Sequence, residues 1–328
     1  LASSAASDVY KRQVKMALVR SNRQIVKNTI STTGLQAGGI LNPEQAQKFI
    51  QQTFENTALG GVIRHETRRA KTGEIDKIGI ASRILRKKTE NTDDGYRAGV
   101  KHDKLEYATT AVRVPWEITE ETLRENIEGQ HYEKIVTDLM TTQIGIDLED
   151  LYLNGDTAVA ESDEDHDFLY VNDGWVKQLK NGSHVVDRSA QSGGALNLDV
   201  FYDTLKAIPN KYNNGKLRWM MSPHRRQEWE RYILNQAVTA GGIITDKRVE
   251  NPASIPAIEV PRMPDDVIML TDPKNLIVVN TYDVIIRKTV EGKEAIMQDK
   301  RFYVVHLDFD AIIEELDAAA IITGLAAI

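Results

Sequence analysis

The most chemically suggestive residues in this sequence form an acidic run, Asp163-Glu-Asp165-His-Asp167. Carboxylates at alternate positions supply oxygen ligands in the manner of a calcium loop, so a metal-dependent enzyme is one hypothesis for residues 161–167. However, Phe168 occupies the position where a calcium loop requires glycine, and Gly174 occupies the position of its bidentate glutamate. We therefore interpret 161–167 as a solvated acidic loop and keep the metal-dependent enzyme as a distant alternative.

The sequence lacks the residue patterns of other catalytic sites. It contains no cysteine, which excludes thiol catalysis, disulfide scaffolds and cysteine-ligated metal centres. Its seven histidines are scattered without metal-ligand spacing, and Gly215-Lys216 lacks the remaining residues of a phosphate-binding loop. It has no dinucleotide fingerprint and no nucleophile elbow. We therefore predict that the protein is not an enzyme and uses no cofactor or metal.

The composition is that of an ordinary globular protein. The chain has 328 residues, of which 41% are hydrophobic and 27% charged, so we expect one elaborate domain or two ordinary ones. The net charge of −7 argues against a surface that wraps nucleic acid. The longest uncharged apolar stretch, residues 318–328, is too short to span a bilayer, so we predict no membrane association.

The first residues need separate treatment. From Ser3 to Gln13 the sequence matches the in-frame translation of a common transposase sequencing adapter. We therefore exclude residues 1–13 from the fold prediction as an assembly artefact. A disordered arm is the alternative.

A basic arm and a short helix come next. Residues 14–40 are basic and weakly patterned, which is typical of an extended arm. Asn42 is then a good N-cap, and Pro43 suits the first helical position. Gly60-Gly61 ends the predicted helix. Its apolar side chains share one face at helical spacing and are Ala46, Phe49, Ile50 and Phe54.

Residues 62–117 alternate more like strands than like helices. A weak apolar run, Ile75 to Ile80, is followed by a stronger alternation of Val112, Val114, Trp116 and Ile118. The polar stretch between them, Arg83 to Lys104, is too long for a tight turn. We predict a long two-stranded projection, which cannot be stable alone.

The longest periodic segment predicts a helix from Tyr132 to Leu151. Its apolar residues recur at i, i+3, i+4 and i+7, and the twenty-odd residues up to the stop at Asn154 correspond to about 35 Å at 1.5 Å per residue. Asn154-Gly155-Asp156 stops the helix, and we expect a left-handed cap at Gly155. The apolar positions are Tyr132, Ile135, Val136, Leu139, Met140, Ile144, Leu148 and Leu151. Beyond this helix the pattern becomes mixed α/β, and propensity alone favours helix for residues 310–320.

Charge is segregated along the chain. Val14 to Trp116 contains 18 Lys and Arg against 10 Asp and Glu, whereas Glu117 to Asp167 contains 2 basic and 16 acidic residues. Complementary potentials of this kind steer association between molecules. The alternative is that both segments are solvated faces that balance one another within one molecule. Because the predicted projection cannot bury itself, we favour contacts between subunits.

Four strings carry a resemblance to a known family. The most family-like is Asp147-Leu-Glu-Asp-Leu-Tyr-Leu-Asn-Gly-Asp156 at the end of the long helix. Three further strings are similar to the same family: Asn172-Asp-Gly-Trp175, Met221-Ser-Pro-His224 and the tail from Phe302 to Leu325. The order and spacing of these strings and of the predicted segments over residues 42–328 resemble those of the major capsid proteins of tailed bacteriophages, which share the Hong Kong 97 fold.

The resemblance implies an α+β fold with an N-terminal arm, an extended hairpin loop, a peripheral domain with a long spine helix, and an axial domain. In this fold the tail is a strand, so residues 310–320 are expected to be extended. The implied segments are 14–62 for the arm and short helix, 63–112 for the hairpin, 113–156 and 275–313 for the peripheral domain, and 157–274 and 314–328 for the axial domain.

The hairpin is then expected to lie on the acidic spine of a neighbouring subunit, and the loop at Gly241-Gly242 to approach a five- or sixfold axis. The candidate contact residues are Arg86, Lys87, Lys88, Lys101 and Lys104 on the hairpin, with Glu120, Glu121, Glu128, Asp147 and Asp150 on the helices.

The function implied is that of a major capsid protein. Subunits would form hexamers and pentamers of an icosahedral virion shell around double-stranded DNA, without sequence-specific binding, after assembly in the bacterial host cytoplasm. Scaffolding, portal and decoration proteins are candidate partners, and an encapsulin-like protein compartment is the alternative. Residues 289–299 contain no asparagine to pair with a hairpin lysine, so we predict a shell without covalent cross-links.

Overall fold

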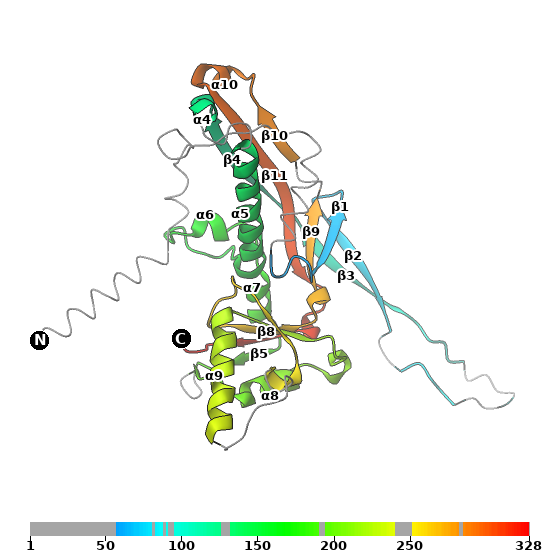
Figure 1. Ribbon diagram of the computed structural model, residues 1–328. Helices are drawn as coiled ribbons and strands as arrows, with labels where there is room; N and C mark the ends of the chain where they lie inside the picture. The colour runs from blue at the N-terminus through cyan, green and yellow to red at the C-terminus, as the bar shows by residue number, and fades with distance from the viewer. Residues whose placement is uncertain are drawn as a thin grey trace, which may run out of the picture.

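The computed structural model describes residues 57–80, 83–87, 90, 95–125, 132–189, 194–239, 251–281 and 285–327. They form a mixed α/β architecture with two five-stranded sheets and one two-stranded sheet. In Figure 1 the first sheet and the long helix α5 occupy the upper half, the second sheet lies below them, and the two-stranded sheet projects to the lower right. Most of the predicted N-terminal helix lies outside the described residues, and Thr57 to Gly60 form turns rather than its last helical turn.

The first sheet has the strand order β1-β9-β11-β10, and β4 also pairs with β11. Its only parallel pairing among the described strands joins β1 to β9, which places residues 64–68 in this sheet rather than in the projection. The strands are β1 (Arg64–Arg68), β4 (Thr110–Thr119), β9 (Leu276–Thr281), β10 (Ile285–Thr289) and β11 (Lys300–Ile313).

Strand β4 confirms the strong alternation seen in the sequence. Trp116 and Ile118 are buried, whereas Arg113 and Pro115 point to solvent. Because β4 pairs with β11 alone among the described strands, it is an edge strand, where the missing N–H of Pro115 is tolerated. The Trp116 ring stacks on Tyr303 of β11, with 5.3 Å between the ring centroids.

The tail of the chain is extended, as the resemblance implied and contrary to its helix propensity. Strand β11 pairs with β9 through residues 309–313, so every residue of that end has a ladder partner. A short 3-10 turn, Leu316–Ala318, then leads to β12 (Ala320–Thr323) in the second sheet. Tertiary pairing overrides local propensity here because β9 supplies backbone partners to residues 309–313, and residues 268–270 of the second sheet supply them to residues 320–322.

The predicted long helix is α5 (Tyr132–Asn154), which packs on the first sheet. Thr119 caps the preceding helix α4 (Glu120–Glu125), since its Oγ1 accepts a hydrogen bond from the amide of Thr122 at 3.3 Å. Five of the eight predicted apolar positions of α5 are buried. Ile135 and Leu139 are exceptions, with exposed fractions of 40% and 63%.

The expected left-handed cap at Gly155 is wrong. Gly155 is not among the described glycines with positive φ. A side chain there would instead meet the carbonyl oxygen of Asn172 at 2.4 Å. The glycine is therefore required for close approach of two backbone segments, which a local sequence pattern cannot distinguish from a cap.

The second sheet has the order β5-β12-β8-β6-β7, and both of its faces are covered. Trp219 and Met221 of β6 face helices α8 and α9, whereas Met220 between them faces the core shared with α5. This double burial explains the continuous apolar runs of its central strands. The elements not yet bounded are β5 (Val185–Asp187), β6 (Arg218–Met221), β7 (Ala257–Glu259), β8 (Ile268–Thr271), α8 (Leu198–Ala207) and α9 (Pro223–Thr239).

Short elements complete the described fold: α6 (His166–Leu169), α7 (Trp175–Lys180), α10 (Lys293–Gln298) and the 3-10 turns Asn210–Tyr212, Pro252–Ser254 and Pro273–Asn275. Among the described helices, none combines the length and apolar character that crossing a membrane requires. The described residues also contain no cluster of three or more His, Asp or Glu side chains arranged to hold a metal ion.

The projection is a hairpin of β2 (Thr72–Gly79) and β3 (Lys101–Ala108), joined antiparallel over their whole length. The prediction of two strands is confirmed, but their pairing was wrong. The stretch predicted as a polar connection supplies part of β3, and the Val112–Ile118 run pairs with β11 instead. The sequence pattern does not predict β3, because most of its side chains face solvent and the strand therefore lacks an alternation of apolar and polar residues.

Candidate intersubunit surfaces

The base of the hairpin is packed against the outer face of the first sheet. Ile75 of β2 and Tyr107 of β3 are buried in a small core with Ile277, Val279 and Ile312. This packing orients the hairpin relative to the sheet without covering the rest of its length. In Figure 1 the paired strands leave the sheet and continue well beyond it.

Polar contacts reinforce this base. The backbone N–H of Ala108 donates to Asp310 Oδ2 at 2.8 Å, and Lys71 pairs with Asp308 at 3.0 Å. Burial raises the pKa of the Asp310 carboxyl above its ordinary value, against the lowering effect of the Ala108 hydrogen bond. Lys77 donates to the carbonyl of Glu314 and so holds the end of β2 to the end of β11.

Beyond the base, the hairpin presents large apolar side chains to solvent. The exposed fractions are 70% for Ile78, 60% for Ile80, 93% for Leu85 and 59% for Val100. Exposed apolar side chains gathered on one projecting element are typical of a protein interaction site.

The candidate cations of the hairpin fall into two groups. Lys101 pairs with Asp103 at 2.7 Å, and Lys104 pairs with Glu74, so both are balanced within the hairpin. Nearer the tip, the Arg86 guanidinium lies 3.7 Å from the centroid of the Tyr96 ring. Lys87 is exposed, and Lys88 lies outside the described residues.

The candidate acidic residues on and after α4 differ in whether they have a partner within the chain. Glu120 is held by Arg301 through two nitrogens, one of them Nη2 at 3.1 Å from Oε2, so it has a partner within the chain. Glu121 is exposed, and among the described residues no ion pair to it is found. Glu128 and the predicted axis loop at Gly241-Gly242 lie outside the described residues.

Asp147 and Asp150 lie on the C-terminal half of α5. Asp147 accepts a hydrogen bond from Gln143 at 2.7 Å, and burial raises the pKa of its carboxyl. It lines a groove of about 260 Å³ between α5 and β4. Asp150 accepts from Asn154 at 2.7 Å and lies 3.9 Å from Arg262. Among the candidates that lie within the described residues, no cation of the hairpin is therefore paired with a candidate carboxylate of the helices in the same subunit.

Charge pattern alone missed a buried ionic cluster at the start of α5. The Glu133 carboxylate is buried and accepts hydrogen bonds from Tyr303 at 2.6 Å, from Arg301 at 3.0 Å and from Lys288. Burial, together with the neighbouring Glu133 carboxylate, raises the pKa of Tyr303. The cluster joins α5 to β10 and β11. No sequence spacing indicates it, since its partners are more than 150 residues away.

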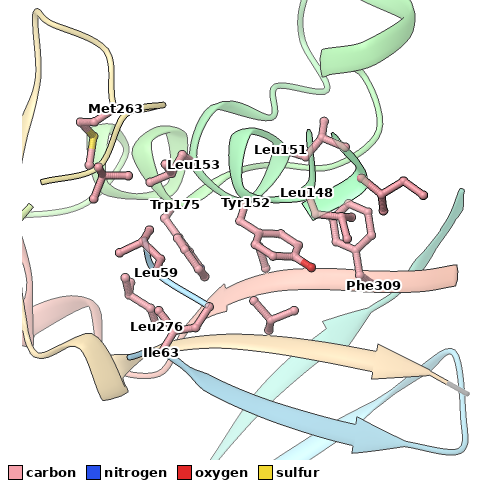
Figure 2. Close-up of a cluster of buried hydrophobic side chains, with 14 of the residues drawn as sticks. Leu59, Ile63, Leu148, Leu151, Tyr152, Leu153, Trp175, Met263, Leu276 and Phe309 are labelled. Carbon is pink, nitrogen blue, oxygen red and sulfur yellow. The ribbon is translucent and has the colours of Figure 1, made fainter. Parts of the chain in front are cut away.

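Two family-like strings meet where the sheets join. The N–H of Gly174 donates to the carbonyl of Gly155 at 2.8 Å, and the indole of Trp175 donates to the carbonyl of Ile312 at 3.2 Å. Figure 2 shows Trp175 among Leu153, Leu59 and other core side chains at this junction. The strings thus position α5 and α7 rather than carry chemistry.

Asn275 also stabilises the junction between the two sheets, and the sequence analysis did not predict this role. Its Nδ2 donates to Thr271 Oγ1 at 3.1 Å and to the Glu315 carbonyl at 2.9 Å, while its Oδ1 accepts from the Glu315 N–H at 2.9 Å. One side chain therefore ties together the two chain crossings between the sheets.

Serine, histidine and aspartate also meet at the string Met221-Ser-Pro-His224, but not as a catalytic triad. The Ser222 hydroxyl donates to Asp265 and accepts from the N–H of Arg225 at 3.2 Å. His224 lies on the far side of the same carboxylate, at 3.3 Å. The histidine therefore does not contact the hydroxyl it would have to activate, and Ser222 serves as the cap of α9.

A model of the P2 family of phage major capsid proteins matches residues 21–325. The chain belongs to this family. The capsid protein is 28% identical to "Putative prophage capsid protein YqbE" of Bacillus subtilis (strain 168), with 92% of this chain and 98% of that protein covered.

Solved structures give the same fold. A chain of the satellite phage P4 procapsid matches with a TM-score of 0.62 and 16% identity, covering 86% of the capsid protein and 99% of that chain. The capsid of an empty GTA particle matches with a TM-score of 0.57 and 11% identity, covering 93% and 96% of the two chains. The capsid protein therefore has the Hong Kong 97-like fold that the sequence resembled.

Family membership decides between the two shell hypotheses. The capsid protein assembles with copies of itself into the shell of a phage virion, and the encapsulin-like alternative is not favoured. The family is a structural one, which agrees with the predicted absence of an enzymatic role. Its functional surfaces are consequently those that meet neighbouring copies.

Proposed function

We propose that the capsid protein builds hexamers and pentamers of an icosahedral shell, and that the β2–β3 hairpin of each subunit docks on a neighbour. In this proposal α5 with the first sheet is the peripheral domain, residues 113–156 and 275–313. The second sheet with α8 and α9 is the axial domain, residues 157–274 and 314–328. Residues 14–62 are the arm, and 63–112 are the segment that first supplies β1 to the first sheet and then forms the hairpin. Gly241-Gly242 approaches the capsomer axis.

One observation carries the docking proposal: the hairpin is anchored at its base and uncovered along the rest of its described length. Leu85 is 93% exposed, and Ile78 is 70% exposed. A two-stranded ribbon in water is marginal alone, so a partner surface must supply the missing burial. In a shell of identical subunits that partner is a second copy of the chain.

Charge sets the direction of docking. We propose that Arg86, Lys87 and Lys88 face the carboxylates of the neighbouring spine, because complementary potentials fix register between identical molecules. Lys101 and Lys104 contribute less, since Asp103 and Glu74 already balance them. On the acidic side we propose that Glu121, Glu128 and Asp147 contribute more than Glu120 and Asp150, which lie beside Arg301 and Arg262 of their own subunit.

The shell is proposed to enclose double-stranded DNA without sequence-specific contacts. The net charge of −7 suits a container that does not grip its DNA tightly. Scaffolding, portal and decoration proteins are proposed partners, and assembly is proposed to take place in the host cytoplasm. The segment from Thr289 to Asp299 offers no asparagine, so we propose a non-covalent shell whose denaturing gels show no ladder.

Reversing the three charges of the tip tests the docking. The variant R86E/K87E/K88E should remain a folded subunit, as circular dichroism would report, and should form no shells under negative-stain electron microscopy. Raising the salt concentration should also weaken assembly of the unmodified protein, because exposed charges are screened.

The matched control, R86K/K87R/K88R, keeps all three charges and the cation above Tyr96 and should form normal shells. Normal assembly of the charge-reversed variant would refute the docking role of these cations. Failure of both variants would assign the tip to packing rather than charge and would also contradict the proposal.

A further inference from the structure

An open groove lies between helix α5, helix α6 and strand β4. Its volume is about 260 Å³. A pocket that holds a whole small ligand usually measures about 300–1,000 Å³, so this groove has room for one or two side chains rather than for a cofactor. Figure 1 shows α6 beside α5, where the two helices are in contact.

The walls of the groove are apolar side chains that the subunit buries incompletely. Val112 and Val114 come from β4, and Phe168 and Val171 come from α6 and the turn after it. All four pack against the large core and remain partly exposed, whereas Leu148 of α5, which also lines the groove, is buried. The groove therefore favours an apolar side chain that completes this burial.

Two carboxylates line the same groove, Asp147 of α5 and Asp167 of α6. Asp147 accepts a hydrogen bond from the neutral amide of Gln143, and Asp167 is exposed. Arg262 acts electrostatically on Asp147 but lies 3.9 Å from Asp150. In the part of the chain that the structure describes, neither Asp147 nor Asp167 forms an ion pair.

A cation, Arg113 of β4, is also among the lining residues. It stands between Val112 and Val114, whose side chains pack toward α5. Because successive side chains of a strand point to opposite faces, the guanidinium of Arg113 points to the other face of the sheet. The groove thus combines apolar walls with uncompensated negative charge.

The tip of the hairpin has the complementary features. Leu85 is 93% exposed, and Ile84 before it is 40% exposed. Arg86 and Lys87 follow directly in the chain, and Lys87 is exposed. An uncovered apolar side chain therefore stands beside two cations, as the groove combines apolar walls with two carboxylates.

The hairpin of the same subunit starts from the opposite face of the first sheet. Its base packs on Ile277 and Val279 of β9, whereas the core that α5 covers contains Leu276 and Val278 of that strand. In Figure 1 the hairpin projects away from α6. The tip therefore points away from the groove of its own subunit and can enter that of a second copy.

We propose that the groove receives Leu85 from the hairpin of a neighbouring copy. Lys87 then lies beside Asp167, and Arg86 lies on the side of Asp147. The apolar side chain covers the partly exposed walls, and the opposite charges fix its direction of entry. The inference rests on the docking proposal. It adds the place on the neighbour that the tip occupies, and it gives Asp167 of the acidic loop a role in assembly.

An exchange of charges tests the pairing. Lys87→Glu should lower the yield of shells, measured by sedimentation, about tenfold, because it sets a carboxylate against Asp167. Adding Asp167→Lys to the same chain should restore the yield to within about twofold, because the pair forms again with its charges exchanged. The matched control adds Glu164→Lys, which reverses an exposed acid of the same loop that does not line the groove, and it should restore nothing.

The outcomes separate this inference from the docking proposal. Equal rescue by Asp167→Lys and Glu164→Lys would assign the effect to the net charge of the loop and overturn the inference. If R86E/K87E/K88E prevents assembly while Asp167→Lys rescues nothing, docking on a neighbour stands and the groove is not its site. An unchanged yield with Lys87→Glu would also refute the pairing.

Introduced cysteines locate Leu85 directly, because the natural chain contains none. Shells of the double variant L85C/V171C should form disulfides between subunits under mild oxidation and give a ladder on a non-reducing denaturing gel. The control L85C/L234C carries its second cysteine at a residue 59% exposed on α9 and should give no ladder.

Two results of the cysteine experiment would contradict the inference. A linked monomer of altered mobility from L85C/V171C would place the tip on its own subunit. Ladders of equal strength in both variants, or in neither, would mean that Leu85 does not enter the groove. The charge exchange introduces no cysteine and decides the matter if L85C/V171C forms no shells.

Discussion

The start of α5 and the tip of the hairpin use charged side chains in opposite ways. At the start of α5, Glu133 is buried and meets Lys288, Arg301 and Tyr303 from the same chain. On the hairpin, cations and apolar side chains alike face outward, and Leu85 is 93% exposed. The first region completes its interactions by folding, whereas the second leaves them for another molecule. A shell subunit needs both, because it must be rigid in itself and unsatisfied at its edges.

The largest expected effect comes from breaking the buried cluster. Glu133→Ala should lower the free energy of unfolding of the unassembled subunit by about 3 kcal/mol, because it removes the buried carboxylate shared by Lys288, Tyr303 and Arg301, of which Arg301 alone among the described contacts keeps a second carboxylate, in Glu120. Urea titration followed by circular dichroism would measure the loss. Glu121→Ala, an exposed neighbour on α4, should change stability by less than about 0.5 kcal/mol. Equal effects of the two substitutions would erase the contrast between the regions.

The base of the hairpin should behave like the interior rather than like the tip. Tyr107 is 7% exposed and packs on the first sheet, so Tyr107→Ala should cost about 3 kcal/mol. Hydrogen exchange of the β2 and β3 amides should rise in parallel. If exchange stayed slow, the base would not be what holds the hairpin to the sheet.

Asp310, at the base of the hairpin, should make the stability of the subunit depend on pH. Its pKa is raised in the folded subunit, so the folded state binds the proton more tightly than the unfolded state does. The subunit should therefore gain stability as the pH falls through this raised pKa, and the cost of the buried charge is fully present above it. Asp310→Asn keeps an oxygen for the Ala108 amide and should reduce the acid gain, whereas Asp147, whose pKa burial also raises, keeps its own part of it. Urea midpoints from pH 7 to pH 4 measure the gain, and an unchanged gain in Asp310→Asn would mean that Asp310 does not contribute to it.

The smallest effect on the subunit belongs to the tip. Leu85→Ser should change the free energy of unfolding by less than about 0.5 kcal/mol, because the side chain buries almost nothing in the subunit. Shell yield, measured by sedimentation, should nevertheless fall strongly. A subunit destabilised by 2 kcal/mol or more would mean that the tip folds back on its own chain.

Local patterns predicted those elements whose pattern is itself local. The alternation through Trp116 gave the edge strand β4, and the 3.6-residue periodicity from Tyr132 gave α5. Local pattern did not predict strand β3, since residues 101–108 expose most of their side chains and show no apolar alternation. The exposure of Leu139 was missed for a related reason, because periodicity marks an apolar face without saying what covers it.

The candidate contact residues were found from charge segregation, and the structure divides them by partner. Charge counting could not tell that Glu120 is occupied by Arg301 while Glu121 is exposed, since the two residues are adjacent in the sequence. Their difference arises from which side of α4 faces β11.

The sequence by itself determined the resemblance to the family, which four strings carry, the positions of β4 and α5, and the separation of basic from acidic segments, because these are properties of neighbours along the chain. Only the tertiary structure decided that Gly155 is needed for the approach of Asn172 rather than for a turn, that Asn275 joins the two sheets, and that Glu133 meets its cations. Those roles depend on contacts between segments up to 170 residues apart. Geometry in space, and not spacing in sequence, brings such groups within hydrogen-bonding distance.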